Sequence, residues 1–120
     1  MWCRGIRGAT TCRDNTRAEI ISATKELLQG LVASNTLQIE DIGAITFTTT
    51  TDLNAEFPAA ATRELGWKDL ALLCGHEMNV IGALPRVIRI LMMVNTEKKA
   101  GELVHVYLRD AVKLKTQNTK

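Results

Sequence analysis

One apolar run, residues 87–94, most constrains the fold of this chain. The run holds aliphatic side chains and methionine, and its one charged residue is Arg89. Strands that read as continuous apolar runs are usually covered on both faces, so this run predicts a strand inside a sheet. A guanidinium cannot lose its proton there, and burying it unpaired is costly. Arg89 therefore needs an anion, either a carboxylate of the protein or one of a ligand.

The composition indicates one globular domain. The chain has 120 residues, 46 % of them hydrophobic, and a formal charge of +2, which is too small to favour nucleic acid or a membrane surface as a partner. Its three cysteines lack paired spacing, which favours a reducing compartment and hence the cytoplasm. No signal-like start and no apolar run of ~18 residues occurs, so we expect neither secretion nor a membrane span. We assign residues 1–115 to the domain and residues 116–120 to a mobile tail.

Local patterns predict the elements around this strand. Thr16 and Glu19 form a capping-box pattern in front of a one-sided apolar stripe, which indicates a helix. Helices are expected over residues 16–34 and 59–65, and strands over 1–10, 43–51, 70–74, 84–95 and 103–108. This order predicts an α+β fold, a mixed sheet of about five strands with two helices on one face. Two helices are thin cover for so apolar a sheet, which suggests an oligomer.

Three kinds of chemistry can be considered for the polar residues before the apolar run: metal binding, nucleophilic catalysis and phosphate binding. Cys74, His76 and Glu77 make one crowded cluster, whereas a zinc site needs a second pair of ligands, so we expect no metal. A nucleophilic Cys74 needs a base, and His76 is expected to point elsewhere from an extended loop. Gly75 and Gly82 do not open a helix, so they do not form a phosphate-binding turn.

Cations without an evident partner in the sequence remain. They are Arg7, Arg63 and Arg89, with Tyr107 as a hydroxyl donor. Arginine forks match carboxylates bidentately. With Glu77 and Cys74, this set predicts a pocket for a small dianionic acid that carries a hydroxyl group. A plain surface role remains the alternative for Arg7 and Arg63.

Six short segments then carry motifs that share their order with a known family. The segments are residues 4–11, 52–59, 61–65, 74–78, 86–92 and 105–108. Together they resemble the AroH-class chorismate mutases, in register over about residues 1–115. The resemblance implies a chorismate-mutase-like fold, related to the ferredoxin-like folds, that assembles as a homotrimeric pseudo-α/β barrel with active sites at subunit clefts. It also implies the cofactor-free Claisen rearrangement of chorismate to prephenate, in phenylalanine and tyrosine biosynthesis.

The resemblance further implies roles for single residues. Arg89 resembles the catalytic cation at the ether oxygen, with its counter-ion supplied by the substrate. Glu77 and Cys74 resemble the groups that hold the ring hydroxyl, and these two complete the catalytic set with Arg89. Arg7 and Tyr107 resemble carboxylate contacts.

The rest of the implied binding set lies around these groups. Phe57 and Arg63 resemble the part of the cleft that a neighbouring subunit gives, and Leu114 resembles part of a flexible cover. Leu73, Gly75 and His76 complete the implied set. Three positions depart from the family pattern, namely Ala60 for a lysine, Leu73 for a threonine and Lys115 for an arginine.

Two other functional classes remain open. One is a trimeric imine-hydrolysing or small-acid-binding protein of the YjgF-like kind, which has a similar sheet and a cleft arginine. The other is a non-catalytic regulatory domain that binds an aromatic amino acid.

Overall fold

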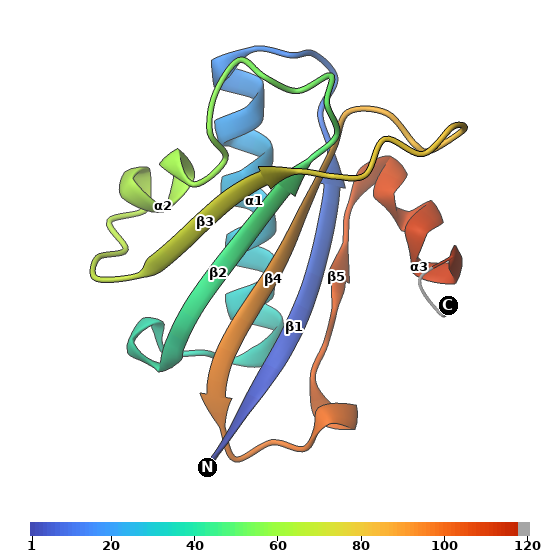
Figure 1. The fold of residues 1–120 in the computed structure, drawn as a ribbon. Coiled ribbons are helices and arrows are strands. Elements are labelled where there is room, and N and C mark those ends of the chain that lie inside the picture. Colours follow the sequence, from blue (N-terminus) through green and yellow to red (C-terminus); the bar gives the residue numbers. More distant parts are fainter. Residues whose placement is uncertain (118–120) are drawn as a thin grey trace.

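Five strands form one mixed sheet in a computed structural model that describes residues 1–117. The strands are β1 (Trp2–Thr11), β2 (Ile42–Thr49), β3 (Ala71–His76), β4 (Val87–Thr96) and β5 (Val106–Tyr107). Their order across the sheet is β3-β2-β4-β1-β5 (Figure 1). β4 is central and antiparallel to both β1 and β2, while β3 and β5 are added in parallel at the edges. The predicted α+β class and the five-stranded mixed sheet are confirmed.

Helices α1 (Arg17–Asn35) and α2 (Ala60–Glu64) cover one face of this sheet (Figure 1). The Oγ of Thr16 accepts a hydrogen bond from the Glu19 backbone N–H at 3.2 Å, so the predicted N-cap forms. The Glu19 carboxylate accepts from the Arg13 backbone N–H instead of completing the capping box. Phe47 and Leu27 lie at the centre of the core between helix and sheet, both fully buried. Within residues 1–117, no helix combines the length and apolarity needed to cross a bilayer.

The apolar run in β4 is covered along one face, and on the other face only at its start, Val87. Ile88, Ile90 and Met92 point into the core and are at most 2 % exposed. Arg89 and Leu91 point to the opposite face, where Leu91 is 43 % exposed. The expectation of a strand covered on both faces is therefore wrong beyond Val87 in one chain, because nothing within residues 1–117 buries Leu91 on the second face.

Two strand ends differ from the sequence expectations. β3 extends through Gly75 and His76, which were expected in a loop, because both pair with the last residues of β2. β4 begins at Val87 and not at residue 84, because Arg86 adopts a left-handed φ of 52° and breaks the extended conformation. The backbone N–H of Arg86 donates to the Asp52 carboxylate at 3.0 Å, which holds this turn.

The predicted last strand, residues 103–108, is reduced to Val106–Tyr107. The side chain of Asn35, at the end of α1, binds both backbone polar groups of Val104. Its Oδ1 accepts from the Val104 N–H at 2.7 Å, and its Nδ2 donates to the Val104 carbonyl at 2.9 Å. Since the N–H of Val104 already donates to a helix side chain, it is not available for the ladder with β1.

Two further helical segments follow β5 and lie against the face that α1 leaves open. They are the 3-10 helix η3 (Arg109–Lys113) and the helix α3 (Leu114–Gln117). Ala111 and Leu114 are buried against Ala9 and Val87. The helices are thus not confined to one face. Of the expected mobile tail, residues 116–117 belong to α3, and residues 118–120 lie outside the described part of the chain.

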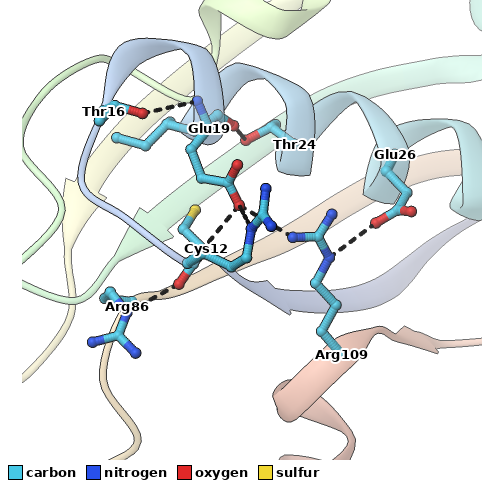
Figure 2. A network of polar contacts seen from close by, with 9 residues as sticks. Cys12, Thr16, Glu19, Thr24, Glu26, Arg86 and Arg109 are labelled. Carbon is cyan, nitrogen blue, oxygen red and sulfur yellow. Dashed lines mark hydrogen bonds and ion pairs between the residues drawn. The ribbon is translucent and has the colours of Figure 1, made fainter.

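Ion pairs tie this C-terminal segment to α1 (Figure 2). The Nη1 of Arg109 lies 3.2 Å from Glu19 Oε1, and its Nε lies 3.5 Å from Glu26 Oε1. A hydrogen bond from the Arg13 backbone, together with the charges of Arg13 and Arg109, lowers the pKa of the Glu19 carboxyl. These contacts hold the start of η3 beside α1.

Candidate active site

Arg89 lies on the open face of the sheet beside a carboxylate of the same chain. Its Nε is 3.1 Å from Oε2 of Glu77, the first residue after β3. The same Oε2 accepts a hydrogen bond from the Oγ1 of Thr48 at 2.7 Å. The expectation that only the substrate supplies the counter-ion of Arg89 is therefore wrong, because Glu77 neutralises it in the free chain.

The ion pair nevertheless leaves Arg89 with unused donor capacity. Within residues 1–117, the buried Nε of Arg89 has no hydrogen-bond acceptor in good alignment, although Glu77 lies within ion-pair distance. A buried donor without an aligned acceptor costs free energy, and a functional role is one reason for a protein to retain it. The Arg89 side chain is 38 % exposed, so a ligand can still reach it.

Two hollows meet at Arg89 and Thr48. One, of about 290 Å³, is lined by Arg7, Arg89 and Tyr107 together with backbone and side-chain atoms of the open face. The other, of about 440 Å³, is lined by Glu77, Met78, Val80 and Ala83 as well as by Arg89 and Thr48. The structure thus brings together four of the predicted site residues. They are Arg7, Glu77, Arg89 and Tyr107.

His105 supports the first hollow and was not among the predicted site residues. Its Nδ1 accepts a hydrogen bond from the backbone N–H of Arg7 at 2.9 Å, just beyond the short β5 ladder. Burial and the nearby charge of Arg7 lower the pKa of His105. A lowered pKa favours the neutral imidazole, whose Nδ1 can accept this bond and hold the Arg7 backbone to His105.

Cys74 lies on the opposite face of the sheet from Arg89. Cys74 pairs across the strands with Phe47, which is buried under the helices, whereas Arg89 pairs with Thr48, which pairs with Gly75. Side chains of cross-strand partners share a face and successive side chains alternate. Within one chain, Cys74 and Arg89 therefore line different hollows, and the prediction that they face one ligand requires a second copy of the chain.

Cys74 instead belongs to a hollow of about 340 Å³ next to α2. This hollow is also lined by Phe57, Gly75 and His76, and Phe57 is 70 % exposed. Burial raises the pKa of the Cys74 thiol, against a backbone hydrogen bond from Ala59 that lowers it. At neutral pH Cys74 is therefore a protonated thiol, which can donate a weak hydrogen bond.

The expectation that His76 points away from Cys74 is wrong, because both lie in β3 two residues apart and so share a face. The spacing along a strand still separates them by ~6.6 Å. The Nδ1 of His76 lies 3.2 Å from the Oγ1 of Thr49. In residues 1–117, no group of three His, Cys, Asp or Glu side chains gathers in a way that could hold a metal ion.

The other predicted residues are dispersed. Arg63 is exposed on α2, and Leu73 is 66 % exposed on the same sheet face as Arg89. Leu114 is only 5 % exposed, packed against Ala9 and Val87. The structure therefore holds Leu114 down in a small cluster and not in an open cover.

Thr48 is a residue of this site that was not among the predicted site residues, because the strand-end interpretation of threonines 48–51 was preferred to an anion-binding one. It belongs to a run of four threonines, residues 48–51, that strand propensity alone explains. No spacing rule singles out the one whose hydroxyl meets Glu77, which is 29 residues away along the chain.

Comparisons with known proteins find relatives over nearly the whole chain. The family model described as chorismate mutase type I matches residues 3–118. Proteins named chorismate mutase AroH are similar over the chain. That of Thermus thermophilus is 45 % identical over 93 % of both chains, and that of Bacillus subtilis is 41 % identical over 100 % of this chain and 99 % of its own. A solved chorismate mutase from Clostridium thermocellum superposes with a TM-score of 0.90 and 46 % identity, covering 94 % of this chain and 99 % of that one.

Proposed function

Because this chain belongs to the type I chorismate mutase family, we propose that it is an isomerase that rearranges chorismate to prephenate for phenylalanine and tyrosine biosynthesis. The observation that carries the proposal is the cationic hollow of Arg7 and Arg89, with the unaligned, buried Nε of Arg89 at its edge. Two arginines suit a substrate with two carboxylates, which bind guanidinium groups bidentately. The relatives give no support to the YjgF-like alternative.

The reaction needs no nucleophile and no proton transfer. In the Claisen rearrangement the C–O bond to the ether oxygen breaks while a C–C bond forms, and negative charge develops on that oxygen. Arg89 donates to this oxygen, and its charge interacts more strongly with the transition state than with the ground state. Because this donor is already oriented in a partly dry site, little free energy is needed to reorganise the site when the transition state forms.

The other residues orient the substrate. Arg7 and Tyr107 bind carboxylates in the first hollow, which holds the two reacting ends in a compact conformer. The Glu77 carboxylate accepts a hydrogen bond from the ring hydroxyl. The protonated thiol of Cys74 contacts the same hydroxyl from the other side of the cleft. Phe57 supplies an apolar wall.

These roles require more than one copy of the chain. Cys74 and Phe57 belong to one face of the sheet, and Arg89 belongs to the other. The open face also carries Leu73 and Leu91, which are 66 % and 43 % exposed. Exposed apolar surface of this kind marks an interface. We therefore propose a homotrimeric pseudo-α/β barrel in which each cleft combines the Arg89 side of one copy with the Cys74 side of the next.

The cytoplasm is the proposed location. All three cysteines are free thiols, which suits a reducing compartment.

A direct test follows the loss of chorismate by its ultraviolet absorbance with the purified protein. We expect prephenate as the product and the same rate with and without a chelator. A chain that does not consume chorismate would refute the proposed function. Loss of activity on chelation would point to a metal-dependent reaction.

Mixing experiments test the shared cleft. Arg89→Ala damages one side of each cleft, and Phe57→Ala combined with Arg63→Ala damages the other side. Each protein alone should be nearly inactive. After unfolding and refolding together in equal amounts, about a quarter of the clefts should combine two intact sides and regain activity. A mixture no more active than its two components would show that each site lies within one chain, and a fully active Phe57/Arg63 variant would exclude these residues from the site.

A further inference from the structure

The Glu77 carboxylate is held through one of its two oxygens. Oε2 accepts from Thr48 Oγ1 at 2.7 Å and lies 3.1 Å from Arg89 Nε. The backbone N–H of Glu77 also donates to the Thr49 carbonyl at 2.9 Å, which fixes the start of its side chain. Neither side-chain contact uses Oε1, so this oxygen can accept a further hydrogen bond.

Thr48 is well placed to set this orientation. It lies in β2 directly between Gly75 of β3 and Arg89 of β4, on the open face of the sheet. A Cβ added to Gly75 would meet no atom within 4 Å, so no neighbouring side chain of β3 competes for the hydroxyl. The branched side chain of threonine is restricted at χ1, which keeps the hydroxyl in place.

An arginine and a carboxylate left to themselves tend to form two parallel hydrogen bonds. Such a fork would use both carboxylate oxygens and two guanidinium donors at once. Here the carboxylate meets Arg89 at a single oxygen, and the short charge-assisted bond from Thr48 occupies that same oxygen. The bond therefore opposes rotation of Glu77 into a closed fork with Arg89.

We propose that Thr48 is a positioning residue that holds Glu77 by Oε2, so that Oε1 receives the hydroxyl of the substrate and the terminal N–H groups of Arg89 stay available to it. The inference rests on the proposed function and assigns Thr48 an effect that acts through Glu77. Its consequence is a catalytic group whose two oxygens have different tasks.

The test compares Thr48→Val, which removes the hydroxyl at nearly constant shape, with Thr48→Ser, which keeps it. We expect Thr48→Val to lower kcat/KM on chorismate by roughly ten- to a hundredfold, as expected for a lost hydrogen bond to a charged group. Thr48→Ser should stay within about threefold of the wild type, since the donor is restored. Thr10→Val is the matched control, because Thr10 is buried on the helix-covered face and, among the described residues, its hydroxyl has no partner. It should retain the wild-type rate.

A double-mutant cycle separates positioning from a general loss of structure. In the Glu77→Ala background, Thr48→Val should cost no further activity, because the group it positions is gone. Equal losses in both backgrounds, or a full rate in Thr48→Val, would overturn the proposal, as would a Thr10→Val loss of the same size. A wild type that does not consume chorismate would refute the proposed function itself. An active wild type in which Thr48→Val causes the same loss with and without Glu77 would refute only the role of Thr48. Circular dichroism and Tm check that each variant folds.

Discussion

Arg89→Ala should lower kcat on chorismate by at least about two to three powers of ten, which is the usual cost of removing one preset donor to a developing oxyanion. Arg89 is the cation on the open face that combines a buried, unaligned Nε–H with access from a hollow. Steady-state kinetics measure the effect. Arg89→Lys should fail almost as badly, because an ammonium group is a point charge without the fork of the guanidinium.

The fold should survive this change. The Arg89 side chain is 38 % exposed and pairs only with Glu77 among the described residues, so the core beneath β4 stays intact. Arg4→Ala is the matched control, since it removes the same charge from β1, where Arg4 donates to the Lys98 carbonyl away from both hollows. An Arg89→Ala protein that kept most of its rate would contradict the electrostatic mechanism. An equal loss in Arg4→Ala would trace the effect to net charge and not to the site.

Glu77→Ala should reduce kcat/KM by about ten- to a hundredfold or more, since it removes the acceptor for the substrate hydroxyl and the carboxylate beside Arg89. Glu77→Gln keeps the shape and an acceptor oxygen but loses the charge, so its rate should fall between those of the wild type and the alanine variant. The comparison is made by measuring kcat and KM for all three proteins. Glu77→Gln as impaired as Glu77→Ala would assign the effect to charge alone. A fully active Glu77→Ala would remove Glu77 from the site.

Local signals in the sequence were reliable where local physics decides the structure. The N-cap at Thr16 and the one-sided stripe behind it gave helix α1 nearly to the residue. The apolar run gave β4, because a strand paired on both sides must bury at least one face. The need of Arg89 for an anion also followed from residue chemistry, although the sequence left open which anion it was.

Local signals failed where distant groups compete. The last strand was expected to be longer, but the amide of Asn35 binds the Val104 backbone across 69 residues of sequence. The role of Thr48 likewise depends on a contact that strand pairing creates between β2 and the end of β3. Contacts of this kind leave no periodicity in the sequence.

The sequence by itself determined that Arg89 is a charge in an apolar strand, because residue type and hydrophobic pattern are properties of the chain. Only the tertiary structure decided which face each group occupies and which atoms meet. Strand register placed Arg89 beside Thr48 and Glu77 and placed Cys74 on the opposite face. The physical reason is that side chains alternate along a strand. A shift of one residue in the pairing would move each side chain of the strand to the opposite face, and the site residues would no longer meet.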